Sequence, residues 1–372
     1  MRTLHVLLFF TGFSAVISAN AGNKQLKDYF LPMEPQGPLV SEGIFGTPEV
    51  FPRDPLNGLE DSDVSDWVYW DGRIVKGHDG KYHLYASRWD QSMNHSDGWH
   101  FGSKAIHSVS DDVMGPYKDT GLAWPHWEEG KGHNVIGLRM HDGRYAMVCS
   151  AITYGEVFTS DNPDGPWELL GKLKVDPNGY ERGLAILSSG GRERWSNVSL
   201  ILRPDGRYMI VPRSTATLIS DDGILGPYKI VHDRVYRKYP DLPQTKNEDP
   251  TVWYSGGMYH IVYNHWPTKT AYHFTSADGI HDWTYRGIAF KKDDMPFRYT
   301  DGTTNDWSFI ERPMAFVEDG HVTHFTFSVL DVKKGQDRGN DNHGSKILVV
   351  PFDGKAFDRD MQRIVAKERK GG

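Results

Sequence analysis

The chain has 372 residues, a single cysteine and a formal net charge of −7 at pH 7. One cysteine excludes an internal disulfide, and an acidic chain without Lys/Arg runs argues against nucleic acid or an anionic membrane as the main partner. Aromatic residues make up 13% of the chain and include 12 Trp. This content is typical of tightly packed sheets and of surfaces that stack on sugars.

The first 21 residues have the pattern of a secretory signal. Arg2 precedes an apolar run from Val6 to Ile17, and Ala19-Asn20-Ala21 forms a small-residue cleavage site. The apolar run is too short to span a bilayer. The sequence therefore predicts a secreted or periplasmic protein, cleaved near Ala21, with no membrane insertion.

Residues 22–60 are punctuated by Pro and Gly and show no apolar periodicity. Such a segment predicts an arm rather than a domain of its own. We expect this N-terminal arm to lie over the body of the protein or over the partner subunit of a homodimer.

From residue 61 onward one pattern occurs five times. Each copy opens with a mostly polar pair, continues with a short apolar run and a Gly-centred turn, and ends in a second alternating run. The second members of the pairs follow one another at intervals of 63, 63, 52 and 63 residues: Asp71, Asn134, Asn197, Asp249 and Arg312. A period this long and regular indicates a repeat architecture.

The turns of the repeat indicate its strand order. Asp-Gly or Gly-Gly pairs between apolar runs, as at Gly80, Gly143 and Gly206, supply the positive φ angles of two-residue hairpins. Four copies carry a second turn, Ser-Asp followed by Gly-Pro-aromatic in three of them. Four strands in each of five units predict an all-β fold, a five-bladed β-propeller with four antiparallel strands per blade, over residues 61–354. A β-sandwich is disfavoured because strand order and turn chemistry repeat together.

Two further features complete the chain. Cys149 lies in a strand-like apolar run, which predicts a buried small side chain rather than a nucleophile. Residues 355–372 are rich in charge and end in Lys370-Gly371-Gly372, so we expect a charged C-terminal tail with a frayed end.

The loops of a propeller alternate between its two faces. The short Gly turns share one face and are nearly uniform, whereas the loops after the second strands and between blades are long and unlike one another. Examples are the loops over residues 89–102, 169–195, 285–310 and 330–344. Variable loops on a repeated scaffold are where a binding site is usually built, so the long-loop face is predicted to carry the site.

The polar pairs open onto that face beside the axis, and the second strands end there. The strand starts contribute Asp71, His133, Asn134, Asn197, Glu248, Asp249, Glu311 and Arg312. The strand ends contribute Arg88, Arg213, His265, Trp266 and Asp331. A polar residue at a strand start can also cap a backbone group or bind water, but a polar residue in all five copies favours a site. Two carboxylates held across a pocket are what glycosidic hydrolysis requires.

The blade repeat, its turns and these strand starts resemble the five-bladed propeller glycoside hydrolases of family 43 and relatives such as family 117, over about Asp61 to Asp353. The resemblance implies that Asp71 is the catalytic base and that Glu248, in Glu248-Asp249-Pro250, is the acid. Family 43 has a tuning Asp in blade three, where this chain has Asn197, which can hydrogen-bond but carries no charge. Asp249 or Glu311 then takes that role, or the mechanism differs.

His133 is the fourth catalytic candidate, because it resembles a His that some relatives use near the reacting centre. The substrate-binding candidates are Arg88, Asn134, Arg213, Asp249, His265, Trp266, Glu311 and Arg312. The three Arg side chains suit carboxylate or sulfate groups, unless they pair with Asp90, Glu248 or Glu311. The first interpretation is therefore an exo-acting glycoside hydrolase on anionic oligosaccharides from an algal or plant cell wall.

Two alternatives belong to other classes. A polysaccharide lyase or oligosaccharide dehydratase would act by β-elimination on a uronic acid, with His133, Asn134, Asn197 and Arg312 as its set. A non-catalytic sugar-binding propeller is disfavoured by the number of titratable groups at the axis. We expect that no cofactor is required. Binding of a divalent cation such as Ca²⁺ is an open alternative, and the polar loop from Asp337 to His343 is one candidate site for it.

Overall fold

The computed structural model describes residues 24–371 except 44–46, 64, 150–154, 177, 179–194, 196, 296 and 341–343. The predicted signal segment, residues 1–21, lies outside the described residues, as does the end of the polar loop that runs to His343. Every structural statement below concerns the described part of the chain.

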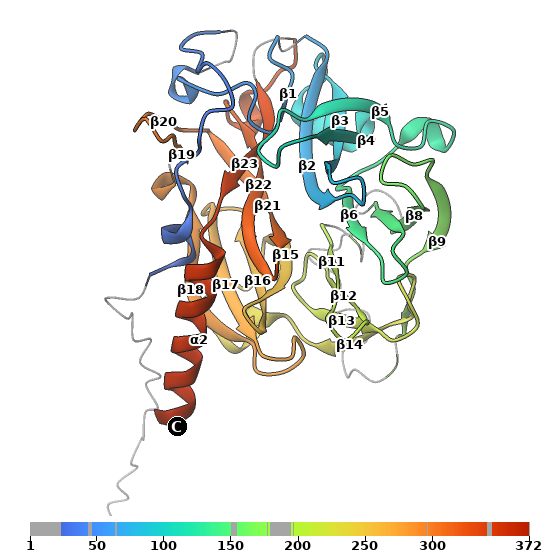
Figure 1. Ribbon diagram of the computed structural model, residues 1–372, viewed down its shortest axis with the longest axis vertical. Coiled ribbons are helices and arrows are strands. Elements are labelled where there is room, and N and C mark those ends of the chain that lie inside the picture. The colour runs from blue at the N-terminus through green and yellow to red at the C-terminus, as the bar shows by residue number, and fades with distance from the viewer. Residues whose placement is uncertain are drawn as a thin grey trace, which may run out of the picture.

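Five sheets surround a common centre, which confirms the predicted five-bladed β-propeller (Figure 1). Blade one consists of β2 (Trp67–Lys76), β3 (Tyr82–Asp90), β4 (Lys104–Ser110) and β5 (Lys118–Leu122). Blade two consists of β6 (Ile136–Arg139), β7 (Tyr145–Val148), β8 (Glu156–Ser160) and β9 (Glu168–Lys172). Blade three consists of β11 (Ser199–Leu202), β12 (Tyr208–Val211), β13 (Thr217–Ser220) and β14 (Tyr228–His232), with β10 (Val175–Asp176) added in parallel to β14.

Blade four consists of β15 (Asn247–Ser255), β16 (Met258–His265), β17 (Thr270–Ser276) and β18 (Thr284–Lys291). Blade five combines β21 (Phe309–Glu318), β22 (His321–Leu330) and β23 (Ser345–Pro351) with β1 (Leu59–Glu60). A separate two-stranded ribbon is formed by β19 (Phe297–Arg298) and β20 (Thr304–Asn305). The helical elements are η1 (Leu26–Tyr29), η2 (Pro48–Val50), α1 (His95–Asp97), η3 (Gly98–Gly102), η4 (Glu128–Gly130), η6 (Val235–Lys238), η7 (Lys292–Asp294), η8 (Lys334–Gln336) and α2 (Gly354–Gly371).

The first strand of each blade lies innermost. In Figure 1 β2, β6, β11, β15 and β21 encircle the centre, and β5, β9, β14 and β18 lie at the periphery. Contacts between inner strands run from β21 to β2, β6, β11, β15 and back to β21. Both sides of these strands are therefore buried, which accounts for continuous apolar runs such as Ile74-Val75 rather than strict alternation.

The N-terminal arm closes the ring of blades. β1 pairs in antiparallel register with β23, with Leu59 opposite Ile347, so the first described strand completes the last blade. Asn57 extends the joint, because its side chain donates to the Val349 carbonyl and accepts from the Val349 amide, each at 2.9 Å. The predicted boundary at residue 61 thus falls just after a strand of the propeller.

Other parts of the arm cover its own propeller. Leu26, Tyr29, Met33 and Val50 are buried in the cluster that includes the blade-five strands. The apolar side chains of the arm are therefore used within this chain, which was one of the two arrangements expected for it.

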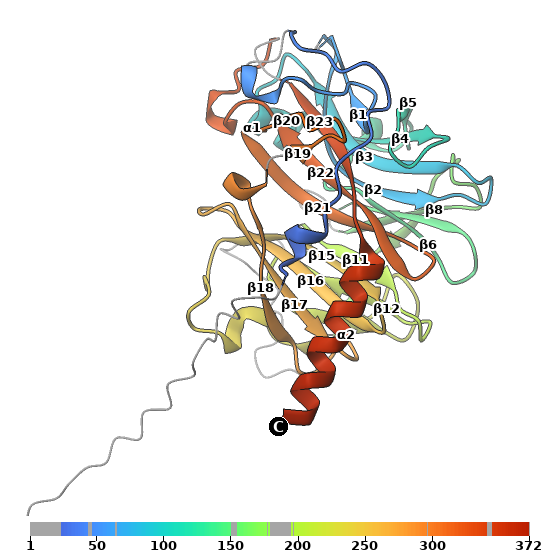
Figure 2. The ribbon, with the colours of Figure 1, turned by 60° about the vertical axis from the view of Figure 1, so that its left-hand side comes forward.

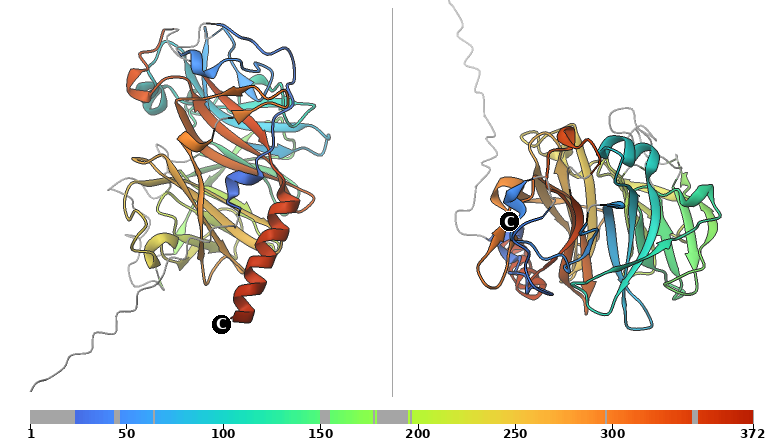
Figure 3. Two further views of the ribbon diagram at one scale, coloured as in Figure 1. Left: turned by 90° about the vertical axis from the view of Figure 1, so that its left-hand side faces the viewer. Right: turned by 90° about the horizontal axis from the view of Figure 1, so that it is seen from above.

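The C-terminal stretch corrects the expectation of a charged tail. Gly354–Gly371 form α2, whose Phe357 and Met361 are buried. Asp358 accepts hydrogen bonds from Ser255 at 2.8 Å and His321 at 2.6 Å, which joins the helix to blades four and five. Figure 2 shows α2 beside the strands of blade four, and Figure 3 shows its C-terminal end reaching past the sheets.

The short-turn face differs in detail from the predicted two-residue hairpins. Blades four and five do have two-residue turns, since Ser255 pairs with Met258 and Glu318 with His321. In blade one the Gly77 amide donates to Lys81, which closes a three-residue loop, and blades two and three repeat this pattern. Gly80, Gly143 and Gly206 nevertheless have positive φ angles of 82°, 89° and 83°, as predicted.

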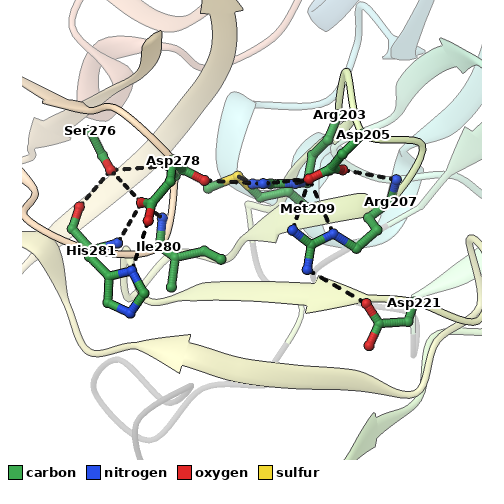
Figure 4. A network of polar contacts seen from close by, with 10 residues as sticks. Arg203, Asp205, Arg207, Met209, Asp221, Ser276, Asp278, Ile280 and His281 are labelled. Carbon is green, nitrogen blue, oxygen red and sulfur yellow. Dashed lines mark hydrogen bonds and ion pairs between the residues drawn. The ribbon is translucent and has the colours of Figure 1, made fainter.

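Polar contacts join neighbouring blades on this face. Between blades three and four, Arg203 pairs with Asp205 at 2.8 Å and donates to the Asp278 carbonyl at 3.1 Å (Figure 4). Arg203 is buried and stacks over the ring of Tyr259, 4.6 Å from its centroid. A fixed cation therefore bridges two turns of adjacent blades.

Among the described residues, no helix combines the length and the apolar character needed to cross a membrane.

Candidate active site

Within or just before the first strand of every blade stands a residue in the left-handed conformation. These residues stand at the register found in the sequence repeat, and their φ angles lie between 48° and 63°: Asp71, Asn134, Asn197, Asp249 and Arg312. Asn and Asp adopt this conformation more readily than other non-glycine residues, so four of the five positions suit it.

Side-chain contacts join these five residues into a central network. Arg312 Nε lies 2.6 Å from Asp71 Oδ1, and Arg312 Nη1 lies 3.1 Å from Asp249 Oδ1. Asn197 donates from Nδ2 to Asp249 Oδ1 at 2.5 Å, and Asn134 donates to Asn197 Oδ1 at 2.7 Å. All five are almost fully buried, so the network forms a closed floor at the axis.

A cavity of about 860 Å³ opens on this floor. Its walls come from the long-loop face, as the sequence predicted: the turn formed by α1 and η3, the segment from η6 to β15, the end of β16, and η8. Four residues of the central network line it, together with the residues that precede the network in three blades, Trp70, Glu248 and Glu311. The ladder shifts register at these three points, which turns two successive side chains toward the axis.

Glu248 is a carboxyl group whose pKa the cavity raises. Burial, followed by the negative charges of Asp249 and Glu311, raises the pKa of Glu248 to about 8. Arg213 opposes this shift and donates from Nη2 to Glu248 Oε2 at 2.7 Å. Trp266 also lines the cavity, with 47% of its surface exposed. Trp253 of the same blade stacks on His260 inside blade four and does not line the cavity.

The pKa of Glu311 shifts in the opposite direction. Burial alone would raise its pKa, but Lys334 and Lys269 outweigh burial and lower the pKa of Glu311 below its usual range. Lys334 Nζ lies 2.6 Å from Oε2 and Lys269 Nζ lies 3.1 Å from Oε1. The cavity therefore shifts the pKa values of its two glutamates in opposite directions.

Asp71 lies beneath the cavity rather than on its surface. Its Oδ1 is paired with Arg312, and its Oδ2 accepts from Ser87 at 3.3 Å. Burial raises the pKa of Asp71, against the lowering effect of Arg312.

Several other predicted residues lie apart from the cavity. Arg88 pairs with Asp119 of its own blade and stacks over Trp67, with the guanidinium 3.9 Å from the ring centroid. His265 contacts Thr268 at 2.9 Å. Asp331 is buried and accepts from the Gly344 amide at 2.7 Å. These side chains turn toward partners within their own blades, so they do not meet at the axis.

His133 is covered by another side chain. The Trp99 ring packs edge-on against it, with centroids 3.7 Å apart, and His133 does not line the cavity. Burial, with Arg312 next in effect, lowers the pKa of His133 to about 3. His133 is therefore a neutral residue behind Trp99.

The structure adds cavity residues that sequence reasoning did not single out. Two of the loops named as long and variable contribute Trp99, Lys334 and Gly335, and the connection between blades three and four contributes Arg234, Tyr236 and Lys246. Loop length therefore indicated part of the walls, but nothing in the repeat register indicates which loop side chains turn inward.

Solved structures share this architecture. Zg3597, a family 117 glycoside hydrolase produced by the marine bacterium Zobellia galactanivorans, matches with a TM-score of 0.54 and 15% identity, over 80% of this chain and 88% of that chain. A structure described as a glycoside hydrolase matches with a TM-score of 0.51 and 14% identity, over 79% of this chain and 61% of that one. A family 43 β-1,3-galactosidase with galactodeoxynojirimycin has a TM-score of 0.48 and 17% identity, over 76% and 91%.

The chain is thus structurally similar to a family 117 glycoside hydrolase and to a second glycoside hydrolase. No protein-family model matches the sequence, and neither does any curated protein. At these identities the similarity establishes the fold.

Proposed function

We propose that this protein is a secreted, exo-acting glycoside hydrolase that cleaves anionic oligosaccharides in the central cavity. The observation that carries the proposal is the carboxyl pair of Glu248 and Glu311, whose surroundings move their pKa values in opposite directions within one cavity. Glycosidic cleavage requires such a pair, one carboxyl to protonate the leaving oxygen and one ionised carboxylate to act as base or nucleophile.

The shape of the cavity supports a sugar substrate and action at a chain end. Its volume of about 860 Å³ lies within the range of small-ligand sites, about 300–1,000 Å³. The buried central network forms the floor of the cavity, so a sugar chain cannot continue along the axis. Trp266 at the wall offers an exposed aromatic face on which a sugar ring can stack.

We assign the proton donor to Glu248 and the ionised partner to Glu311. Glu248 would transfer its proton to the glycosidic oxygen as the bond to the leaving group breaks, while Arg213 holds the carboxyl group in place. Asp71, the base implied by the family resemblance, is placed to orient Arg312 instead, because that pair is buried in the floor. The assignment of Glu311 rests on its place in the cavity wall.

Charge supports an anionic substrate. Five cationic side chains line the cavity, Arg213, Arg234, Lys246, Arg312 and Lys334, against three acidic ones, Glu248, Asp249 and Glu311. Lys246 is exposed, and no carboxylate of the described residues pairs with it. A local excess of positive charge in a chain of net charge −7 favours uronic acids or sulfated sugars, such as those of algal and plant cell walls.

Elimination from a uronic acid has weaker support from the geometry. It needs a base that reaches the substrate, and His133 lies behind Trp99. Asn134, Asn197 and Arg312 could still neutralise a carboxylate, so the assay must separate the two reactions.

The test uses the mature chain on a panel of anionic and neutral algal and plant oligosaccharides, with products identified by mass. Fragments that together gain one water show hydrolysis, which Glu248→Gln should abolish. New ultraviolet absorbance from an unsaturated uronic acid would show elimination instead, and binding without product would show a sugar-binding protein. We expect turnover without an added cofactor and after extensive dialysis against EDTA. For the proposed secretion, the chain recovered outside the cytoplasm should begin after Ala21.

A further inference from the structure

Two histidines and a carboxylate meet on the face opposite the cavity. His83 lies on β3, His107 on β4, and Asp164 in the turn that follows β8 of blade two. His83 Nδ1 and His107 Nε2 are 2.8 Å apart, and Asp164 Oδ1 lies 3.5 Å from each. Both imidazoles are buried, and the carboxylate reaches solvent.

The outer nitrogens of both rings have fixed partners. The Thr120 hydroxyl donates to the His107 carbonyl at 2.8 Å, so it is left to accept from His107 Nδ1, also at 2.8 Å. Asp79 Oδ1 lies 3.2 Å from His83 Nε2, and an ionised carboxylate can only accept. Both protons therefore point outward, and two lone pairs face each other across 2.8 Å beside the Asp164 carboxylate. Three electron-rich atoms at this distance require a cation among them.

We propose that His83, His107 and Asp164 bind a divalent transition-metal ion of the Zn²⁺ type, which joins blade one to blade two. Two imidazole nitrogens and a carboxylate oxygen are ligands that Zn²⁺ accepts. Bonds of about 2.0–2.1 Å in tetrahedral geometry place ligand atoms about 3.4 Å apart. The two separations to Asp164 already match this value, and the nitrogen pair would open by roughly 0.6 Å, with water in the fourth position.

The surroundings have the form of a built metal site. Ligating histidines usually donate their second N–H to a carboxylate or another oxygen, which fixes the ring and its tautomer. Asp79 and Thr120 occupy these positions here. Tyr85 adds a second link between the same blades, since its hydroxyl donates to the Pro163 carbonyl at 2.8 Å.

Other blades offer two internal comparisons. Between blades three and four the equivalent turns are bridged by the guanidinium of Arg203 (Figure 4), so a cation at this joint has a precedent within the molecule. Blade four repeats the histidine pair, with His260 Nδ1 3.0 Å from His273 Nε2. That pair has Phe357 of α2 against it in place of a carboxylate. The combination of two imidazoles and a carboxylate is specific to the first joint among the described residues.

The experiment is a titration of chelator-stripped mature protein with Zn²⁺, followed by calorimetry and by Tm. Wild type should bind one equivalent and gain several degrees in Tm, because an ion that binds the folded state stabilises it. Co²⁺ in place of Zn²⁺ should give the visible absorption of a tetrahedral site. Asp164→Asn should weaken Zn²⁺ binding by at least about tenfold, and Asp79→Asn by about 10–100-fold through the ring that it orients.

Asp161→Asn is the matched control, because Asp161 is an exposed carboxylate in the same turn and belongs to no metal-ligand group. It should bind Zn²⁺ like wild type. The proposal is overturned if wild type shows no binding and no rise in Tm, in which case a proton fills the position between the rings. It is overturned as well if Asp164→Asn and His83→Gln bind Zn²⁺ as wild type does. Asp164 is exposed, so its variant should fold even if a buried His83 variant does not.

Discussion

Glu248 and Glu311 stand at the same position of two successive blades, each directly before a left-handed residue of the central network. Their surroundings nevertheless shift their pKa values in opposite directions. Two ammonium groups hold Glu311 ionised, whereas Glu248 has one guanidinium partner and two acidic neighbours. A repeat therefore supplies equivalent positions, and the lysines of the loops make them chemically distinct.

Removing either carboxyl group should separate their roles. Glu248→Gln and Glu311→Gln keep shape and hydrogen bonding, and each should lower turnover by about 10²–10⁴-fold. An activated aryl glycoside, which needs no protonation of its leaving group, should restore turnover in the Glu248 variant far more than in the Glu311 variant. Steady-state kinetics on natural and aryl substrates make the comparison.

Asp71→Asn serves as the comparison for the assignment of Glu311. If Asp71 acts only through Arg312, its variant should lose less turnover than Glu311→Gln. The reverse order would return the role of base to Asp71, and near wild-type turnover in both glutamine variants would contradict the hydrolase proposal.

The pH profile should carry the signature of Glu248. An acid catalyst must be protonated, so kcat/KM should fall as the pH rises through the pKa of Glu248 of about 8. Arg213 lowers that pKa, so Arg213→Gln should move the alkaline limb to higher pH. Lys246→Gln is the control, because it removes another cation of the cavity and should leave the alkaline limb at the same pH. If Arg213→Gln does not move the alkaline limb either, Glu248 is not the acid.

At the scale of single elements, the left-handed residue within or just before each inner strand has two structural effects. It interrupts the ladder, and in blades one, four and five the register shifts at that point. It also brings its own side chain into the central network, and in the same three blades its predecessor lines the cavity. Asn and Asp adopt the conformation easily, whereas Arg312 is held there by Asp71 and Asp249.

The short turns on the opposite face depend on backbone conformation rather than on space. A Cβ at Gly143 would meet nothing within 4 Å, yet its φ of 89° strains any other residue. Gly143→Ala should therefore cost about 1–2 kcal/mol, measured by denaturant unfolding. Gly335→Ala is the matched control, since Gly335 has equally open space and no positive φ, and equal costs in the two variants would refute this account.

The sequence was sufficient for the inner strands but not for the elements that cover them. The register from Asp71 to Arg312 could be predicted because every copy has a polar residue at the same position, and each of these residues is left-handed in the structure. The helix α2 left a usable signal, a capping Asp353 whose side chain accepts from Ala356, and Phe357 and Met361 one turn apart. Charge at its surface hid that periodicity.

The direction of side chains at the axis could not be predicted from spacing. Arg88 and Arg312 both stand near the central strands, but Arg88 finds Asp119 within its own blade. Arg312 meets two carboxylates from other blades, whose positions depend on closure of the whole ring. The direction of the Arg88 side chain therefore depends on a partner in its own blade, whereas that of Arg312 depends on the closure of the whole ring.

At the scale of the whole molecule, two acidic residues, Glu60 and Glu318, tie the ends of the propeller together through ion pairs in different surroundings. Glu60 of β1 is buried with Arg53 and with Lys346 of β23, whose Nζ lies 2.9 Å from Glu60 Oε2. Glu318 of blade five pairs with Lys76 of blade one at 2.5 Å, where both side chains reach solvent. The pairs of Glu60 close blade five with the arm, and the pair of Glu318 joins two complete blades.

Glu60→Gln should therefore destabilise the protein strongly, whereas Glu318→Gln should not. Removing Glu60 leaves the charges of Arg53 and Lys346 buried without their carboxylate, a loss of about 3–5 kcal/mol, whereas an exposed pair is weakened by solvent and by side-chain entropy. Because β1 completes the last blade, the loss should appear as a lower midpoint of one cooperative transition rather than as a separate early one. Urea unfolding followed by both Trp fluorescence and circular dichroism measures this. An unchanged midpoint in Glu60→Gln, or two separate transitions, would show that the arm is not part of the cooperative unit.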